Sequence, residues 1–588
     1  MTTRRSKPQR GNADPQARRA QPVEQVDWEQ IRPAARQELS PVLMFSVLLG
    51  FISLMVCFSR GYLLLYGDAV AHLGIARRIL DTRNPGLVQL GGVWLPLPHL
   101  LMLPFVQKMS LWQSGLAGTW PSLACYILSV VGLYRLCRRL LKPRWALVAT
   151  AFYAVNPNLL YLATTAMTEP LFLAELIWIA LVTIEAIEAI RNAQSGRAVR
   201  NLIGLGLLIL AAVFTRYDGW VVGAVAWCLV TWHLRRAPQM RRHLLVPFGI
   251  LTVLAISGPL LWLWYNQHFY HDPLDFMRGP YSAPAIEKRT SPRGSRHYRG
   301  WHNPAWALLF YTRTAQVVAA AWETGFLLMV SAVIGLWAMV KQRLPRASLL
   351  LWLPLPFYVY SVAYGSVPIF IPQLYPHSYY NARYGMELLP ALAVFASIAV
   401  AALEAEWMTA TGSRKAGRAR LLYPAALGLA LLNPLAMTFG TTVCQQIVRL
   451  VRHRKSTVFA IYSPPLVLKE AIVNATTRVP FERNLALFLN ELPPGSTILM
   501  QESDHIGALQ DAGIPLRQTI NETDYDSWHA ALQDPAGHAP YVVAFEGDAV
   551  ARAVAEHPEG LLEISIIGGT GQRSAHIYQS QRFGAPSR

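Results

Sequence analysis

The first long apolar run of the chain, residues 42–58, reads VLMFSVLLGFISLMVCF, and the stretch Tyr66-Gly67-Asp68-Ala69-Val70-Ala71-His72 follows soon after it. A run of this length is long enough to cross the hydrocarbon core of a bilayer as a helix. A carboxylate so close to an apolar span is costly to hold there, so Asp68 is expected to have a partner or a chemical task. Glu169 and Asp218 occupy similar positions beside later apolar runs.

Composition excludes a soluble globular protein. Of the 588 residues, 53% are hydrophobic and only 15% are charged. The apolar residues gather in runs of roughly 17–25, the length of a membrane-spanning helix. The formal charge of +19 does not indicate nucleic-acid binding, because much of the Arg and Lys lies in short segments between apolar runs, as the positive-inside bias predicts. The pattern predicts a polytopic α-helical membrane protein.

About eleven or more transmembrane helices are expected. The predicted spans are 42–60, 117–136, 145–163, 170–190, 201–215, 220–234, 244–266, 318–340, 348–364, 386–403 and 421–440. When the spans alternate in direction, every short basic loop falls on one side. The three carboxylates and the long loops fall on the other side. This agreement is the main support for the predicted topology.

The sequence pattern predicts three parts along the chain. Residues 1–40, which are basic and lack an apolar segment, are expected to form a disordered cytoplasmic tail. Residues 41–440 form the transmembrane domain, whose outer loops are 61–116, 267–317 and 365–385. Residues 441–588 are predicted to be a soluble, extracytoplasmic α/β domain, because short apolar strands at 497–500 and 541–545 alternate with helical patterns at 485–492 and 550–556.

Three outer-side carboxylates at span ends suggest a wet cleft at the membrane boundary. Asp68 is a candidate general base that takes a proton from an acceptor hydroxyl or amine. Glu169 is a candidate partner that orients the acceptor. The structural alternatives are that Asp68 caps a helix beginning at Ala69, that Glu169 lies near the positive end of a helix dipole, and that Arg216 and Asp218 pair across a turn.

Basic residues in the outer loops suggest an anionic partner. Lys288, Arg289 and Arg293 lie in the loop 267–303, against the positive-inside trend. Guanidinium groups grip phosphate oxygens in paired hydrogen bonds, so phosphate is the natural ligand. Arg383, beside Tyr384, is a second candidate for a phosphate joined to a lipid or a sugar. Contact with acidic lipid headgroups and an ordinary aromatic belt are the alternatives.

The order of these motifs resembles the GT-C glycosyltransferases, with family 39 as the best fit. That branch includes the protein O-mannosyltransferases and aminoarabinose transferases. The likeness covers about residues 60–400. It rests on Gly67-Asp68 with His72 and Ala76, Trp94-Leu95-Pro96-Leu97, Asn156-Pro157, Thr168-Glu169-Pro170-Leu171-Phe172, Thr215-Arg216-Tyr217-Asp218-Gly219-Trp220 and Arg383-Tyr384 through Pro390.

The resemblance implies an inverting transfer of a sugar from a polyprenyl-phosphate donor on the outer face of the cytoplasmic membrane. It implies that Asp68 is the catalytic base and that Glu169 is the second acidic residue of the first two outer loops. Arg383 and the basic residues of the loop 267–303 would then bind the donor phosphate. The remaining substrate-binding candidates are His72, Trp94, His99, Arg216, Tyr217, Asp218 and Tyr384.

The expected partners are the lipid-linked donor, a lipid, glycan or protein acceptor, and membrane lipids, with no nucleic acid. No cofactor is expected to be obligatory, because the sequence holds no dedicated metal cluster; divalent-metal dependence varies among GT-C enzymes. A transporter or flippase for a lipid-linked or anionic substrate is the rival function. Transporters often contain repeated halves with sites at mid-membrane. This chain shows no such repeat, and its acidic groups gather at one boundary.

Overall fold

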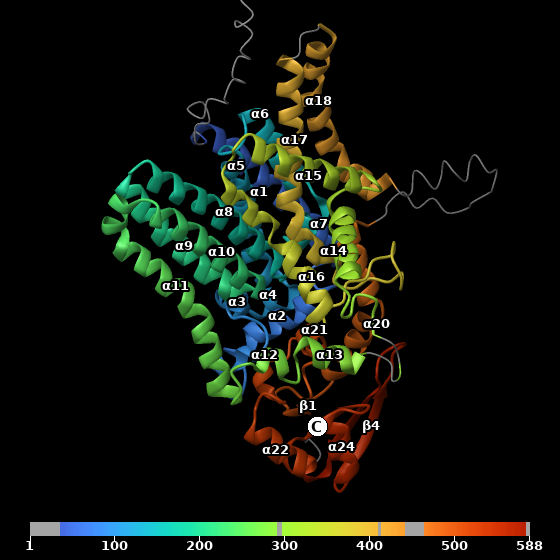
Figure 1. The fold of residues 1–588 in the computed structure, drawn as a ribbon. Coiled ribbons are helices and arrows are strands. Elements are labelled where there is room, and N and C mark those ends of the chain that lie inside the picture. The colour runs from blue at the N-terminus through green and yellow to red at the C-terminus, as the bar shows by residue number, and fades with distance from the viewer. Residues whose placement is uncertain are drawn as a thin grey trace, which may run out of the picture.

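The protein is a helical bundle with a small sheet domain at one end. The computed structural model describes residues 34, 36–290, 294, 297–409, 413–440 and 464–583. In Figure 1 the helices lie side by side, and the strands lie together beyond one end of the bundle. The predicted tail falls outside the described residues except near its end, where Arg36 already begins the first helix.

Within the described residues, nine helical segments are long and apolar enough to cross a membrane. They are α1 (Arg36–Ser59), α5 (Leu116–Cys137), α8 (Glu169–Arg191), α9 (Ser195–Thr215), α11 (Pro238–Tyr270), α15 (Thr324–Lys341), η4 with α16 (Arg346–Tyr364), η5 with α17 (Ala382–Thr409), and most of α18 with the turn after it (Gly417–Phe439). Each overlaps a predicted span. The polytopic helical class is therefore confirmed.

The other two predicted spans are also helical, but one of them is broken. The predicted span 220–234 lies in α10 (Tyr217–Arg235). The predicted span 145–163 is divided into α6 (Pro143–Ala154) and α7 (Pro157–Leu162). Asn156 separates them, because its side-chain oxygen accepts the backbone N–H groups of Asn158 and Leu159 and Pro157 takes the first helical position.

The predicted outer loop 267–317 contains more helix than expected. It holds α12 (Asp275–Arg278), α13 (Ala283–Thr290) and most of α14 (Pro304–Ala319). The prediction that a span begins at residue 318 was wrong, because α14 ends at Ala319 and α15 starts only at Thr324. The break is stabilised by side-chain amides: Asn156 and Asn433 both donate to the carbonyl of Ala319, at 3.2 and 3.0 Å. Backbone groups left free at a helix break inside an apolar body need such partners.

The loop between the first two spans is also largely helical. It contains α2 (Gly67–Arg78), η3 (Leu87–Leu90), α3 (Leu97–Val106) and α4 (Met109–Ser114). The Pro-rich apolar stretch 94–104 forms, from Leu97 on, the short helix α3. This helix packs against α2 and α5. α2 therefore carries Asp68 and His72 on a supported helix rather than on a free loop.

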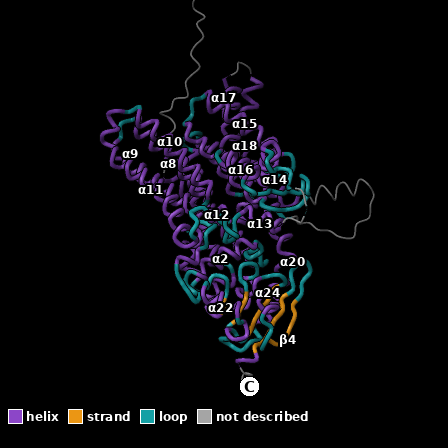
Figure 2. The backbone as a smooth tube through the Cα atoms, turned by 60° about the horizontal axis from the view of Figure 1, so that its bottom comes forward, coloured by secondary structure: helices purple, strands orange, loops and turns teal. Residues whose placement is uncertain are grey.

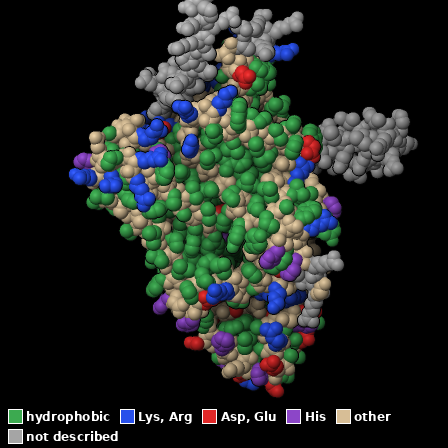
Figure 3. All heavy atoms as spheres, viewed as in Figure 1, with side chains coloured by type: hydrophobic (Ala, Val, Ile, Leu, Met, Phe, Trp, Pro, Cys, Tyr) green, Lys and Arg blue, Asp and Glu red, His purple; other side chains and the backbone are tan. Residues whose placement is uncertain are grey.

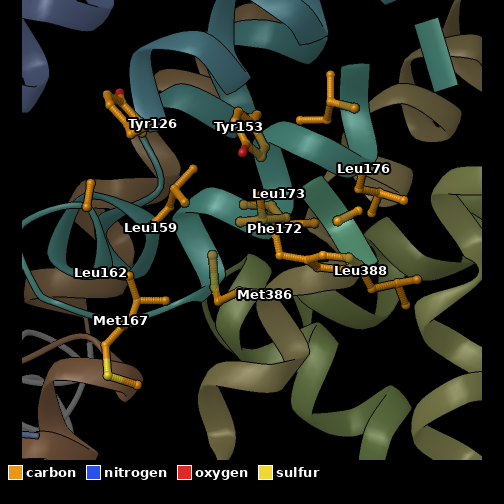
Figure 4. Packing of buried hydrophobic residues seen from close by; sticks show 14 of the residues in the cluster. Tyr126, Tyr153, Leu159, Leu162, Met167, Phe172, Leu173, Leu176, Met386 and Leu388 are labelled. Atoms are coloured by element: carbon orange, nitrogen blue, oxygen red, sulfur yellow. The ribbon is translucent and has the colours of Figure 1, made fainter. Parts of the chain in front are cut away.

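The core of the bundle is built from α5, α8, α9 and α17. Phe172, Leu173 and Leu176 of α8 share one buried cluster with Met386 and Leu388, as Figure 4 shows. Helices also approach closely at small residues. A Cβ atom added at Gly335 of α15 would lie 1.8 Å from the carbonyl oxygen of Phe395 in α17. Packing of this kind, rather than hydrophobic exclusion, holds helices together in lipid.

The protein surface is apolar over the bundle and basic toward one end of it. Exposed apolar side chains cover the outer faces of α1, α11, α15 and α18, and Figure 3 shows them as a continuous field over the bundle. Figure 3 shows Lys and Arg side chains gathered toward the end of the bundle away from the sheet domain. Around the turn from α10 to α11, the exposed basic residues are Arg235, Arg236, Arg241 and Arg242. This distribution is the one on which the predicted orientation depends.

The C-terminal part is an α/β domain, as predicted. The long helix α20 (Leu466–Leu489) leads into a five-stranded sheet of order β2-β1-β3-β5-β4, seen as the orange strands of Figure 2. β1 pairs in parallel with β2 and β3, and β5 is antiparallel to both β3 and β4. The elements after α20 are β1 (Ile498–Met500), α21 (Ile506–Ala512), η7 (Leu516–Gln518), β2 (Thr519–Ile520), α22 (Asp526–Gln533), α23 (Pro535–His538), β3 (Tyr541–Phe545), α24 (Ala549–Glu556), β4 (Leu561–Ile567), β5 (Ala575–Ser580) and η8 (Gln581–Phe583).

This domain is docked on the segment that follows α2. The Nε of Arg83 donates to the carbonyl of Thr519 at 2.8 Å, and Arg517 pairs with Asp81 at 2.8 Å. A second contact is made by the first turn of α20, where the backbone N–H of Val467 donates to the side chain of Asn158 in α7 at 2.8 Å. The domain therefore contacts both the segment after α2 and the core of the bundle.

Replacing Glu502 with Gln is expected to make the stability of the C-terminal domain less dependent on pH. Glu502 is fully buried, and burial, with the nearby charge of Glu522, raises its pKa from 4.5 to about 8. The folded chain keeps this proton to a higher pH than the unfolded chain, so the free energy of unfolding falls as pH rises through this range. Hydrogen exchange of β1 and β3 in the full chain, corrected for intrinsic rates, measures this slope. An unchanged slope in E502Q would contradict the assignment.

Candidate functional site

A cavity of about 450 Å³ opens at the end of the bundle nearer the sheet domain. Its walls come from α2, the loop before α3, the first turns of α8 and α10, α12, α13, α16 and η5. Most residues proposed from sequence lie on this wall: Asp68, His72, Trp94, Glu169, Arg216, Tyr217, Asp218, Arg383 and Tyr384. The structure thus brings together residues from four separate predicted loops and span ends.

Arg383 is bonded to acidic side chains from three different elements. Its Nε donates to Oε1 of Glu169 at 3.1 Å, and its Nη2 donates to Oδ2 of Asp68. Its Nη1 lies 3.7 Å from Oε1 of Glu470, which belongs to α20 of the C-terminal domain. The Arg383 side chain is only 8% exposed. Asp68 thus has a partner across the cavity, on η5, rather than on its own helix.

Arg216 forms a second centre of charge beside the first. Its Nη1 donates to the hydroxyl of Thr168 at 2.8 Å and lies 3.6 Å from Oε1 of Glu169. Its Nη2 lies 3.1 Å from Oε1 of Glu387 and donates to the hydroxyl of Tyr358 at 2.5 Å. The predicted pair between Arg216 and Asp218 is present at 3.4 Å, but it is one contact among several.

Glu169 joins the two centres, because the same oxygen faces both arginines. A buried guanidinium or carboxylate is stable only when its charge is paired and its hydrogen bonds are made. Shared contacts of this kind fix the orientation of each planar guanidinium. The cavity therefore presents charged groups that are already positioned before any substrate enters.

The helix starts explain the placement of the acidic side chains. α2 begins at Gly67, its N-cap is Tyr66, and no side chain caps it. The alternative that Asp68 caps a helix at Ala69 was therefore wrong: Asp68 lies in the first turn and its carboxylate turns to Arg383. Glu169 is likewise the first residue of α8, followed by Pro170. Both carboxylates lie at the positive end of a helix dipole, as the alternative for Glu169 predicted.

Two histidines lie next to each other behind Asp68. Nδ1 of His72 lies 2.9 Å from Nε2 of His99, and the rings of His72 and Trp94 are 4.3 Å apart between centroids. His72 lines the cavity, whereas His99 is fully buried behind it. Burial, with the charges of Arg383 and Arg216, lowers the pKa of His72 to about 3. His72 is therefore a neutral group at physiological pH.

The basic cluster of the long outer loop is only partly described. Ala283 and Pro284 at the start of α13 line the cavity, but Lys288 and Arg289 lie exposed at the other end of that helix. Arg293 lies outside the described residues. Among the residues that the structure does describe, no group of three or more His, Cys, Asp or Glu side chains is arranged to hold a metal ion.

Three buried partners of the arginines were missed from the sequence. Glu387 follows Arg383 by four residues in an apolar span, a position where a carboxylate usually needs a partner, so a signal was present. Tyr358 lies in α16, in the middle of a predicted span. Glu470 lies in α20, and nothing in its local sequence distinguishes it from a surface carboxylate.

The chain resembles known proteins in part of its sequence and in its fold. The family model described as dolichyl-phosphate-mannose-protein mannosyltransferase matches residues 98–262. No curated protein matches the sequence. Among solved structures, the chain is similar to ArnT from Cupriavidus metallidurans bound to undecaprenyl phosphate, with 13% identity, a TM-score of 0.52, and coverage of 94% of this chain and 100% of that one. The fold is that of the GT-C glycosyltransferases.

A second GT-C structure also matches. The oligosaccharyltransferase from Archaeoglobus fulgidus, tethered with an acceptor peptide, has 11% identity and a TM-score of 0.43, and the match covers 94% of this chain and 75% of that one. The match to ArnT confirms, at the level of fold, the resemblance to GT-C proteins noted in the sequence. Within this GT-C fold, the roles of individual site residues remain predictions.

Proposed function

We propose that the protein is a membrane glycosyltransferase that moves a sugar from a polyprenyl-phosphate donor to an acceptor at the end of the bundle that carries the sheet domain. The observation that carries this proposal is the cavity in which Arg383 holds Asp68 and Glu169 together. The printed names of similar proteins support the donor class, since ArnT was solved with undecaprenyl phosphate and the family model is described by dolichyl-phosphate mannose.

Asp68 is proposed as the general base because of its exposure. Its side chain is 41% exposed, whereas those of Glu169 and Glu470 are each about 1% exposed. Of the three carboxylates around Arg383, Asp68 is therefore the one that an acceptor can reach. Its ion pair with Arg383 fixes the carboxylate on the cavity wall, where a base has to lie within hydrogen-bond reach of the acceptor.

The reaction proposed is a single displacement with inversion at the anomeric carbon. The acceptor oxygen or nitrogen attacks that carbon and forms the new glycosidic bond, while its proton passes to Asp68. The bond from the anomeric carbon to the phosphate oxygen breaks, and its electron pair stays on the polyprenyl phosphate. Negative charge develops on the leaving phosphate, and positioned guanidinium groups stabilise such charge. Arg216 and Arg383 are the cavity-lining groups for this role.

Glu169 is proposed to orient both arginines rather than to exchange protons. It is almost fully buried and faces Arg216 and Arg383 with one oxygen. The apolar lining, which includes Leu95, Phe276 and Phe357, suits the first isoprene units and excludes water. Trp94, with His72 against it, offers a flat face to a sugar ring.

Replacing Trp94 with Ala is expected to raise the KM for the lipid-linked donor about fivefold and to change kcat little, because an aromatic contact of this kind is worth about 1 kcal/mol. Steady-state kinetics in proteoliposomes measure both constants. Trp306 of α14 does not line the cavity, so W306A serves as the control and should leave KM unchanged. An unaltered KM in W94A would remove Trp94 from the donor site.

The proposed function is tested with purified protein in liposomes that contain undecaprenyl-phosphate sugars with labelled sugar, together with an envelope extract as acceptor. A glycosyltransferase releases undecaprenyl phosphate and transfers label to the acceptor. A flippase only moves the intact lipid between leaflets, which a membrane-impermeant oxidant of the sugar detects. Movement without sugar release would overturn the proposal in favour of the flippase.

A further inference from the structure

The first turn of α20 is inserted into the bundle beside the candidate site. Val467, Leu468, Glu470 and Ala471 are all buried. The hydroxyl of Tyr66, the residue before α2, donates to the carbonyl of Val467 at 3.0 Å. Together with the bond from Val467 to Asn158, this contact fixes α20 between the start of α2 and α7. A helix of the C-terminal domain therefore forms part of the environment of Asp68.

Glu470 makes two kinds of contact with η5. Its Oε2 accepts the backbone N–H of Ala382 at 2.8 Å, and its Oε1 lies 3.7 Å from Nη1 of Arg383. Oε1 has no hydrogen-bond partner, although the side chain is fully buried. The first contact fixes the backbone that carries Arg383. The second places a negative charge behind its guanidinium.

We propose that Glu470 is a positioning residue through which the C-terminal domain holds the Arg383 guanidinium against Asp68 and Glu169. This inference rests on the proposed function, because it concerns the same site. Glu470 does not line the cavity and does not meet the substrate. It acts through Arg383.

The geometry around Arg383 supports this role. Its three nitrogens face carboxylates from α2, α8 and α20, one on each. Asp68 and Glu169 face Nη2 and Nε, whereas Nη1 faces Glu470. The charge of Glu470 on this third nitrogen, with its bond to the backbone of Ala382, adds to the hold on the guanidinium, and catalysis depends strongly on such fixed orientation.

The protonation of Glu470 predicts a pH dependence of turnover that can be measured. Burial raises the pKa of this carboxyl from 4.5 to about 7, against the opposing effect of Arg383. The groups that face it are Arg383 on η5, Asp68 and Tyr66 at the start of α2, Tyr161 on α7 and Tyr380. Below about pH 7 the side chain is neutral and keeps its bond to Ala382, but it no longer holds Arg383 by charge. Turnover is therefore expected to rise with pH through this value.

The test compares Glu470→Gln with Glu482→Gln over pH 6 to 8. Gln accepts the N–H of Ala382 but carries no charge. Glu482 is the matched control, since it lies on the same helix, is buried, and has a pKa raised to about 7 by burial, but it pairs with Arg478. We expect the ratio of wild-type to E470Q kcat to grow from about 2 at pH 6 to about 10 at pH 8. The ratio for E482Q should stay level. A level ratio for E470Q as well would overturn the proposal.

A conservative variant and a second readout separate this inference from the proposed function. Glu470→Asp keeps the charge, so its pH inflection should persist, although at another pH; loss of the inflection would contradict the proposal. Binding of undecaprenyl phosphate, read as a shift of the thermal midpoint, does not need turnover. If the wild type binds this lipid without turnover, the proposed reaction fails. In that case the positioning role of Glu470 is supported if undecaprenyl phosphate shifts the thermal midpoint at pH 8 in the wild type and in E482Q but not in E470Q. Equal shifts in all three proteins would overturn it.

Discussion

Replacing Asp68 with Asn is expected to lower kcat about 10³-fold, because a positioned general base contributes roughly 10²- to 10⁴-fold. Asn is isosteric and still accepts a hydrogen bond from Arg383, so the cavity should keep its shape. It cannot take the acceptor proton. Turnover of a labelled polyprenyl-phosphate sugar measures the loss, and binding of undecaprenyl phosphate should change little, because Asp68 is proposed to act on the acceptor.

The control is Glu38→Gln, which removes a carboxylate that also pairs with an arginine. The side chain of Glu38, on α1, is 30% exposed and pairs at 2.8 Å with Arg138, which follows the end of α5. Neither residue lines the cavity. This variant should keep full turnover. Near-normal turnover in D68N would remove Asp68 from the role of base. A loss of the same size in E38Q would mean that the assay reports general stability.

Replacing Arg383 with Gln is expected to have the largest effect on stability and to abolish turnover as well. Three carboxylates, those of Asp68, Glu169 and Glu470, would lose the cation between them. Removing one partner of a buried ion pair costs roughly 3–5 kcal/mol. The thermal midpoint in detergent should fall, and donor binding should weaken. Arg383→Lys should keep only part of the thermal stability and of the donor binding that R383Q loses, since an ammonium is a point charge and lacks the planar fork of a guanidinium.

Arg313→Gln is the matched control for Arg383. Arg313 also bonds a carboxylate with two nitrogens, at 2.9 and 2.6 Å, but its partner Glu323 is 75% exposed. Exposed pairs contribute about 0–1 kcal/mol, so the midpoint should hardly change. In the double variant R383Q/E470Q, part of the lost stability should return, because the buried carboxylate of Glu470 is no longer left without its cation. Equal effects of R383Q and R313Q would show that the network is not structurally important.

The spans and the group of site residues could be predicted because their signals are local. Apolar length identifies a spanning helix, and a carboxylate or arginine at a span end stands out against an apolar background. Alternation of spans then places Asp68, Glu169, Asp218 and Arg383 on one side. The cavity contains all four.

The break between α14 and α15 and the role of α20 could not be predicted in this way. The break depends on amides of Asn156 and Asn433, which are more than a hundred residues distant in sequence. Glu470 meets Arg383 only because α20 enters the bundle beside α7 and the start of α2. A hydropathy pattern carries no information about such contacts, since both partners look ordinary in their own segments.

The sequence by itself determined that Asp68 stands near the end of an apolar span with other acidic groups on the same side. The length of an apolar segment and the cost of placing a charge in a membrane are properties of each segment alone, so they can be predicted from the sequence. Only the tertiary structure decided that Asp68 pairs with Arg383, that Glu169 faces two arginines, and that the C-terminal domain supplies Glu470. Ion pairs act over a few ångströms, and only packing brings residues hundreds of positions apart within that distance.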